Sequence, residues 1–242
     1  MRMIENAIVM IKDARGVATS LLEAALVVAI AAVISSVALV SGMTNVDNAR
    51  VSRAQGDTEI IGVAIQSFMT DTGFAPAFKA GNAHSPSDDI FLVLQSSGNE
   101  PIADPSLNWP AAFNPQNPQI SQRDFLANQV VTNQPGYVGT SNFAGVPYPR
   151  MGQISWSRYK GWNGPYNASV PRSDPWDDKY FVNVQLLTQQ GIAQENTLRL
   201  GTGQRPAVFV ISAGPNRTIE TRFDQTADAF VAGGDDIIYR IQ

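Results

Sequence analysis

The chain has no cysteine and a single histidine among its 242 residues. The absence of cysteine excludes disulfide bonds, thiolate metal sites and cysteine nucleophiles. Charged residues make up only 16% of the chain, against roughly 25% in ordinary soluble domains, and its 17 Lys and Arg form no basic run. With a net charge of −4, this composition argues against nucleic acid as a partner.

Few residues offer the chemistry of an enzyme. The lone histidine, His84, lies in an Asn-Ala-His-Ser-Pro stretch typical of a surface loop, so a histidine-based triad or a multi-histidine metal site is not easily built. The segment Gly201-Thr202-Gly203 lacks the residues that continue a phosphate-binding loop. The adjacent aspartates at 88–89 and 177–178 are more typical of solvated turns than of acid–base pairs. We therefore predict that the chain is not an enzyme.

One long apolar run lies near the N-terminus. Residues 21–40 read LLEAALVVAIAAVISSVALV, with Glu23 as the only charged residue. A helix of this length, at about 1.5 Å per residue, crosses a hydrocarbon core about 30 Å thick. It is also longer than the apolar core of a secretory signal peptide, which has about 7–15 residues. We therefore predict a membrane-spanning half at about 21–46, with Lys12 and Arg15 placing the N-terminus in the cytoplasm.

The predicted helix continues beyond this run as an amphipathic second half. Its apolar positions recur at spacings of three and four, with one threonine among them: Val51, Ala54, Thr58, Ile61, Ile65 and Phe68. This spacing is typical of a helix that buries one face. The charged residues off this stripe, which we expect to face water, are Arg50, Arg53, Asp57 and Glu59. The segment Asp71-Thr72-Gly73 ends the helix, so the helical stalk covers residues 19–73.

Residues 74–242 form the predicted globular head. Residues 77–160 are rich in Pro, Asn, Gln, Ser and Gly, which indicates a loop-rich insertion with one short helix around 121–127. Alternating apolar residues then predict strands at 181–186, 207–211 and 237–241. Sequential strands joined by short links favour a small antiparallel sheet against the apolar stripe of the helix. The predicted fold class is therefore α+β, with a long N-terminal helix and long loops.

The stretch from Arg15 to Glu23, RGVATSLLE, together with the following AALVVAIAAV, resembles the class III signal of type IV pilins and type II secretion pseudopilins. In that family a short basic leader ends at a small residue, usually glycine, and a glutamate is the fifth residue of the mature chain. Counting back from Glu23, the resemblance implies that prepilin peptidase removes residues 1–18. Ala18 would be the last leader residue and Thr19 the first mature residue, and the fold would be a pilin fold.

The resemblance also implies a function. Subunits of this family wait in membrane lipid until an inner-membrane assembly platform and its ATPase lift them into a helical homo-oligomeric filament. There the glutamate, here Glu23, offsets the new terminal amine of a neighbouring subunit, since a buried charge needs a partner. We therefore expect a structural filament subunit whose helices bundle through residues 19–70. Its expected location is the bacterial inner membrane, single-pass with a cytoplasmic N-terminus, and then a periplasmic or extracellular filament.

Two C-terminal patterns carry the resemblance further. The segments Gly-Pro-Tyr at 164–166 and Asp-Pro-Trp at 174–176 are similar to those of major pseudopilins, which usually read DPWG where this chain has Asp177. The segment SAGPN at 212–216, with GGDD at 233–236, resembles a pseudopilin loop that binds calcium. Calcium takes six to eight oxygen ligands from carboxylates, amides and carbonyls. The ligands that the resemblance implies are Ser212, Asn216, Asp235 and Asp236.

Two other functions are compatible with the same residues. The first is a minor or adhesive pilin at a filament tip, for which the insertion at 77–160 would be the binding surface. The second is a membrane-anchored periplasmic binding protein or enzyme that never polymerises. An N-terminus at Thr19 in the mature protein would favour the pilin class over this last alternative.

Overall fold

A computed structural model describes the protein at residues 2–79, 90–109, 123–136, 146–153, 161–188 and 204–242, leaving out the side chains at 2–22, 37–41 and 105. The fold is α+β. The chain divides into two compact units, Met1–Ala49 and Arg50–Gln242, and the helix α1 contributes residues to both. Parts of the predicted insertion at 77–160 lie outside the described residues, as do His84 and the segments at 88–89 and 201–203.

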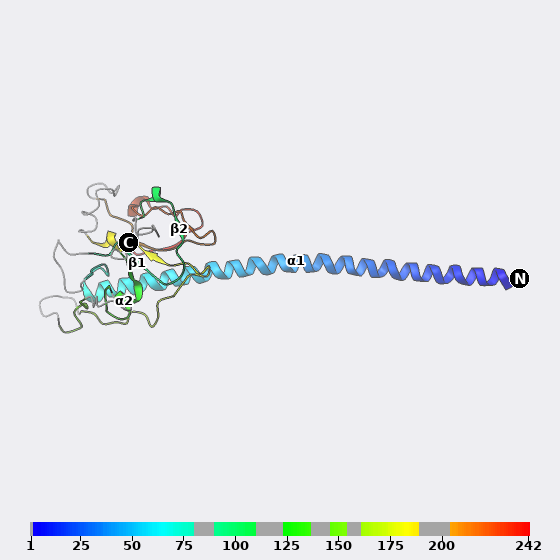
Figure 1. Cartoon of the computed structure of the whole chain (residues 1–242), viewed down its shortest axis with the longest axis horizontal. Coiled ribbons are helices and arrows are strands. Elements are labelled where there is room, and N and C mark those ends of the chain that lie inside the picture. Colours follow the sequence, from blue (N-terminus) through cyan, green and yellow to red (C-terminus); the bar gives the residue numbers. More distant parts are fainter. Residues whose placement is uncertain (1, 80–89, 110–122, 137–145, 154–160, 189–203) are drawn as a thin grey trace. The chain divides into compact units, whose positions relative to one another are not determined.

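The helix α1 comprises 71 residues, Arg2–Thr72, and runs from blue to cyan in Figure 1. Alanine, the strongest helix former, is interspersed among aliphatic residues through its described N-terminal part. The helix ends where its last carbonyl groups find other donors. The Thr72 hydroxyl donates to the carbonyl of Phe68 at 2.7 Å, and the Gly73 N–H donates to the carbonyl of Met69 at 2.9 Å.

The membrane-spanning half predicted at about 21–46 is a wrong prediction. No helix is long and apolar enough to cross a bilayer among the residues whose side chains the structure describes. The predicted single-pass location in the inner membrane and the predicted pilin fold both depend on this span. They are therefore wrong as well.

The main sheet has five strands in the order β3-β1-β4-β5-β7. Their bounds are β1 Val93–Gln95, β3 Arg123–Phe125, β4 Phe181–Val182, β5 Phe209–Ser212 and β7 Ile237–Arg240. The strands β1 and β3 run parallel, whereas β1–β4, β4–β5 and β5–β7 are antiparallel. The sheet is therefore mixed, and the expectation of a purely antiparallel sheet was wrong. A second sheet pairs β2 (Ile102–Ala103) with β6 (Thr218–Ile219) in parallel.

A buried asparagine shortens the strand predicted at 181–186. After β4 the chain turns into the 3-10 helix η4, Val184–Leu187. Asn183 lies between these elements, and its side-chain oxygen accepts the N–H of Phe209 at 2.8 Å. Its side-chain N–H groups donate to the carbonyls of Ala207 (3.0 Å) and Phe223 (3.2 Å). The side chain thus replaces the strand pairing that the alternating pattern predicts.

The remaining short elements lie between these strands. The 3-10 helices η1 (Pro105–Leu107) and η5 (Ala227–Ala229) follow β2 and β6. The helix α2 (Leu126–Val130) follows β3 directly. The short helix predicted around 121–127 is therefore displaced toward the C-terminus, because Arg123–Phe125 pairs with β1 as a strand.

Within the second unit, one face of α1 enters the core. Ile61, Ile65 and Phe68 are at most 2% exposed and belong to one cluster with the buried side chains of β1, β4 and β5. The Phe68 ring packs edge to face against Tyr148, with ring centroids 4.8 Å apart. Half-buried Asp57, by contrast with the prediction that it faces water, accepts the hydroxyl hydrogen of Tyr180 at 2.9 Å. One face of α1, at residues 61–68, thus supplies the centre of the core.

A glycine brings the helix close to the edge strand. A Cβ atom at Gly62 would overlap the ring of Tyr239 in β7, whereas a Cβ at Gly56 would meet nothing within 4 Å. Gly62 therefore occupies the middle of a helix because a larger residue would displace Tyr239. The Gln66 side chain adds a hydrogen bond to the carbonyl of Ile241 at 3.2 Å.

The two glycines give a matched test of this packing. We expect Gly56→Ala to raise the free energy of unfolding by about 0.5–1 kcal/mol, because alanine favours the helix and the site is open. We expect Gly62→Ala to lower it, because overpacking costs about 1–3 kcal/mol and exceeds that gain. Urea unfolding of the two variants and the wild type measures the difference. Two stabilised variants would contradict the close contact with Tyr239.

Candidate functional site

The candidate site lies where two C-terminal loops meet. One loop follows β5 and leads through β6 to Thr221, and the other, residues 233–236, precedes β7. The Asp236 carboxylate accepts the backbone N–H groups of Glu220 (2.9 Å) and Thr221 (2.6 Å). The Asp235 carboxylate accepts the backbone N–H of Asn216 at 3.1 Å. Two neighbouring aspartates thus hold the first loop against the second.

The loops also approach through glycine. A Cβ at Gly233 would overlap the carbonyl of Glu220, so the two backbones could not lie this close with a larger residue. The Gly233 N–H donates to the Thr221 hydroxyl at 2.8 Å. Asn216 organises the first loop, because its side-chain oxygen accepts the N–H of Thr218 (2.7 Å) and its amide donates to the Glu220 carboxylate (2.8 Å).

Ser212, the fourth residue predicted here, serves a different cluster. Its buried hydroxyl donates to the carboxylate of Asp174 at 2.7 Å. Asp174 also accepts the backbone N–H groups of Trp176 (2.9 Å) and Asp178 (2.8 Å), which closes the Asp-Pro-Trp turn. Burial raises the pKa of Asp174 above its usual range. The structure therefore brings Asn216, Asp235 and Asp236 together and ties Ser212 to the turn.

The same turn contains an ion pair that the sequence analysis missed. Asp178 is fully buried, and its two carboxylate oxygens accept hydrogen bonds from the Arg217 guanidinium at 2.6 and 2.8 Å. Asp177 beside it is exposed. The interpretation of residues 177–178 as a solvated turn therefore holds for one aspartate of the two. The available signal was Arg217, which stands in a short loop whose other charged residue is Glu220.

Burial dominates the electrostatics of Asp236. It raises the pKa of this carboxyl to about 6, and the nearby charge of Glu220 adds to the effect, although the Thr221 side chain and the backbone N–H groups of Glu220 and Thr221 oppose it. One oxygen, Oδ1, is buried without a hydrogen-bond partner among the described residues. Asp236 is thus a half-buried carboxylate with one oxygen left over.

The fit to calcium is incomplete in this arrangement. No group of three or more His, Asp or Glu side chains in the described part of the chain is placed to hold a metal ion. The side-chain oxygen of Asn216 and one oxygen each of Asp235 and Asp236 already accept backbone N–H groups. The unpartnered Oδ1 of Asp236 is one oxygen that a cation could take without breaking a hydrogen bond. Calcium binding at this loop stays a prediction of the resemblance.

The residues predicted for processing and assembly lie on α1. Ala18 and Thr19 fall within its helical range, but their side chains are not described. Glu23 is exposed. The apolar residues that follow it are exposed as well, and Val28 and Ile34 keep 68% and 63% of their surface accessible.

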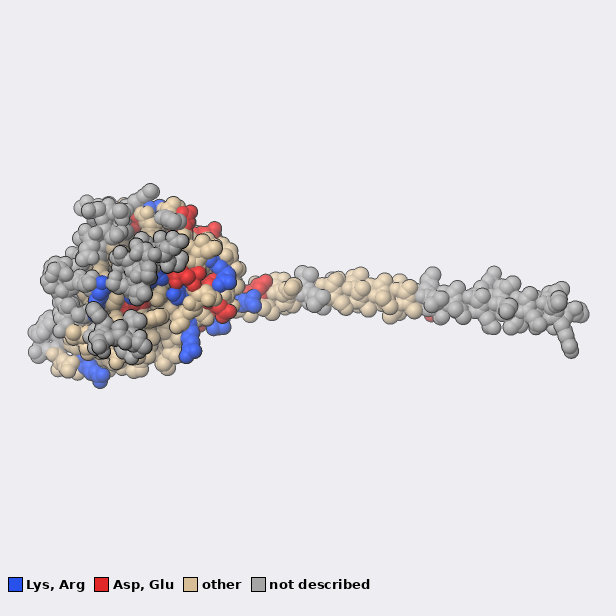
Figure 2. Space-filling view, in the orientation of Figure 1, with Lys and Arg blue, Asp and Glu red and all other residues tan. Residues whose placement is uncertain are grey.

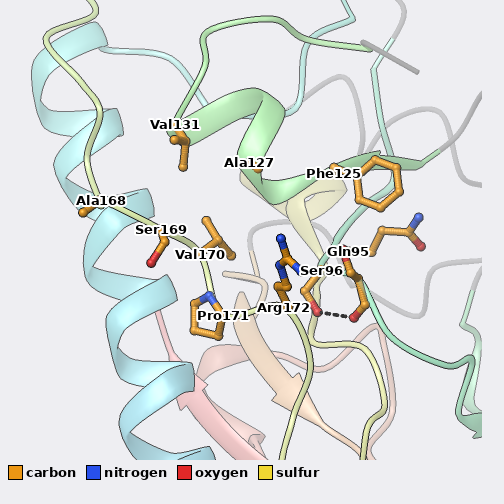
Figure 3. Close-up of a pocket in the computed structure, with 11 residues that line it drawn as sticks. Gln95, Ser96, Phe125, Ala127, Val131, Ala168, Ser169, Val170, Pro171 and Arg172 are labelled. Atoms are coloured by element: carbon orange, nitrogen blue, oxygen red, sulfur yellow. Dashed lines mark hydrogen bonds between the residues drawn. The ribbon is translucent and has the colours of Figure 1, made fainter. Parts of the chain in front are cut away.

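A small pocket lies on the second unit, apart from the C-terminal loops (Figure 3). Its volume is about 290 Å³. Residues from the end of β1, from β3 and α2, and from the segment 168–172 line it: Gln95, Ser96, Ser97, Phe125, Ala127, Val131, Ala168, Ser169, Val170, Pro171 and Arg172. The sequence analysis did not identify it, since its walls come from three distant segments with no shared motif.

Comparison with known proteins gives no relative for this chain. No protein-family model, no curated protein and no solved structure matches it. The resemblance to pilins and pseudopilins therefore stays a prediction from the quoted motifs.

The raised pKa of Asp236 predicts a pH dependence of stability. An aspartate in an unfolded chain titrates near about 3.9, so between about pH 4 and 6 the folded state binds a proton that the unfolded state does not. The free energy of unfolding therefore falls as the pH rises through this window. The variant Asp236→Asn keeps an oxygen for the two N–H groups but cannot titrate. We therefore expect it to remove the part of this decrease in unfolding free energy that comes from Asp236. Urea unfolding from pH 4 to 7 measures it.

The exposed neighbour gives the control, Asp235→Asn. An Asp236→Asn profile that runs parallel to the wild type over this window would contradict the burial of the carboxylate.

Calcium gives a second test of the same loop. If a cation takes Oδ1 of Asp236, the melting temperature in excess calcium exceeds that in chelator, because a ligand at 100 times its Kd adds about 2.7 kcal/mol of stability. We expect Asp236→Asn to reduce the increase. Scanning calorimetry with calcium, with magnesium and with EDTA measures this increase. Coincident melting curves would contradict calcium binding at this loop.

Proposed function

We propose that the chain is a structural subunit of a filament of the type IV pilus or type II secretion pseudopilus kind, assembled by bundling of α1 with α1 of neighbouring copies. The proposal concerns assembly and requires no bilayer-crossing segment. It rests on one observation in the first unit, the exposure of an uninterrupted apolar segment of helix.

The apolar segment surrounds α1. Residues 24–34 are Ala, Leu, Val or Ile, all are exposed, and at 100° per residue they cover every side of the helix. Figure 2 shows this part of α1 as a run without Lys, Arg, Asp or Glu. Exposed apolar surface of this extent is typical of an interaction site. A helix that is apolar all round is stable where it is buried, and a bundle of copies buries every side at once.

Small residues in the same segment allow α1 helices of neighbouring copies to pack closely. Ala25 and Ala29 are four residues apart, as are Ala32 and Ser36, so each pair lies on one face of the helix. Small residues at this spacing let two helices approach closely. The Ser36 hydroxyl donates to the carbonyl of Val33 at 2.8 Å, which satisfies it within its own helix. Neighbouring copies can therefore pack here without leaving this hydroxyl unpaired.

Glu23 gives the bundle its register. It directly precedes the apolar segment, so a bundle that buries residues 24–34 draws this carboxylate toward low-dielectric surroundings. A buried carboxylate needs a cationic partner. Cleavage between Ala18 and Thr19, which the resemblance implies, would create an α-amine four residues before Glu23. In the proposed filament that amine, on a neighbouring copy, is the partner.

The experiment compares two exposed carboxylates of the same helix. We expect Glu23→Gln to abolish assembly, because loss of one partner of a buried ion pair costs roughly 3–5 kcal/mol per subunit. We expect Glu59→Gln, a charge-matched control in the second unit, to assemble as the wild type does. The measurement is the amount of subunit in filaments sheared from cells that express each variant, with N-terminal sequencing of that material.

A mature N-terminus at Thr19 together with loss of filaments in Glu23→Gln supports the proposal. A wild-type chain that stays uncut and monomeric would favour a binding protein or enzyme that does not polymerise. Normal filaments from Glu23→Gln would contradict the role of this carboxylate.

A further inference from the structure

The pocket of the second unit combines one cation with an apolar wall. In Figure 3 the Arg172 guanidinium lies among the lining side chains, with Val170 and Pro171 beside it. Of the eleven lining residues, Arg172 is the charged one. The apolar part of the lining comprises Phe125, Ala127, Val131, Ala168, Val170 and Pro171. This lining favours a ligand with one negative charge and a small apolar group.

Arg172 differs from the arginines that stabilise the fold. Arg123 pairs with Glu100, Arg217 with Asp178 and Arg222 with Asp224. Arg172 makes no ion pair or side-chain hydrogen bond within the part of the chain that the structure describes, and its side chain is exposed. A guanidinium that faces a concave surface without a carboxylate can donate two parallel hydrogen bonds to an incoming one.

Some polar groups around Arg172 already form hydrogen bonds within the protein, and others can still donate to a ligand. The Ser96 hydroxyl accepts the N–H of Tyr180 (2.9 Å) and donates to the carbonyl of Ser97 (2.9 Å, dashed in Figure 3), which fixes this wall. The Gln95 oxygen accepts a hydrogen bond from Arg123 at 3.3 Å, so its amide N–H groups remain as donors. A fixed wall with a few available donors is typical of a site that orients a small polar group.

Size and charge narrow the ligand class. A volume of about 290 Å³ is at the small end of ligand pockets, which are about 300–1,000 Å³. A single guanidinium balances a carboxylate, whereas a phosphate dianion would leave one charge without a cation in an apolar pocket. We propose that this pocket binds a monocarboxylate with a short branched apolar group, presented either as a free acid or as the C-terminal residue of a peptide.

The test uses the full chain and three probes: 4-methylpentanoate, acetyl-Ala-Leu with a free carboxylate, and acetyl-Ala-Leu amide. Binding is measured by NMR titration or calorimetry. We expect saturable binding of at least one carboxylate probe and none of the amide. A charge-assisted hydrogen-bonded pair changes affinity by about tenfold or more, so Arg172→Ala should weaken binding by at least about tenfold. Arg172→Lys, which keeps the charge but not the planar fork, should bind with intermediate affinity.

Two further variants keep the result interpretable. Arg150→Ala removes an exposed arginine that does not line the pocket and should bind as the wild type does. Ala127→Leu fills the pocket without a change of charge and should abolish binding. Unfolding curves confirm that each variant is folded.

The probes also separate the two sources of the carboxylate. Tighter binding of the dipeptide indicates a peptide C-terminus, and tighter binding of 4-methylpentanoate indicates a free acid. No saturable binding of either carboxylate, or equal affinity in the wild type and Arg172→Ala, would overturn the proposal. Neither result bears on filament assembly, because the pocket and the apolar segment of α1 belong to different units.

Discussion

The second unit depends on the burial of one helical face against short strands. Its strands have two to four residues each, and strands of this length form a marginal sheet unless another element covers it. Ile61, Ile65 and Phe68 of α1 provide that cover and are at most 2% exposed. Because the helix supplies the centre of the core, a described connection such as 161–180 needs little regular structure.

Buried carboxylates hold those connections in place. Asp124 accepts hydrogen bonds from the side chains of Asn128 and Gln129 and from the backbone N–H groups of Phe125 and Gly136. Burial raises the pKa of Asp124 nonetheless, because desolvation outweighs these four donors. In a chain without cysteine, aspartates that gather backbone N–H groups fix loops that a secreted domain often fixes with disulfides. The pair of Asp178 and Arg217 does the same between two distant segments.

The sequence carried the information on α1 most clearly, because a spacing of three and four repeats over 51–68 and needs no knowledge of distant contacts. The strands near 209 and 237 follow from short apolar runs. The parallel pair β1–β3 did not, since three-residue strands carry too little pattern.

Asn183 and Asp178 were missed for a related reason: their partners lie far away in the sequence. The prediction of a membrane-spanning half rested on the length of one apolar run, and no helix among the described side chains is long and apolar enough to cross a bilayer. The pocket around Arg172 had no sequence signature, because three segments meet only in the fold.

The hydrogen bond from Gln66 to Ile241 joins residues 175 positions apart. At the usual rates of synthesis, about 5–20 residues per second, a ribosome makes the first of these residues about 9–35 s before the second. Throughout that interval Gly62 lacks its contact with Tyr239 of the edge strand β7. Completion of β7 is therefore a late step in the folding of a core whose centre is translated early.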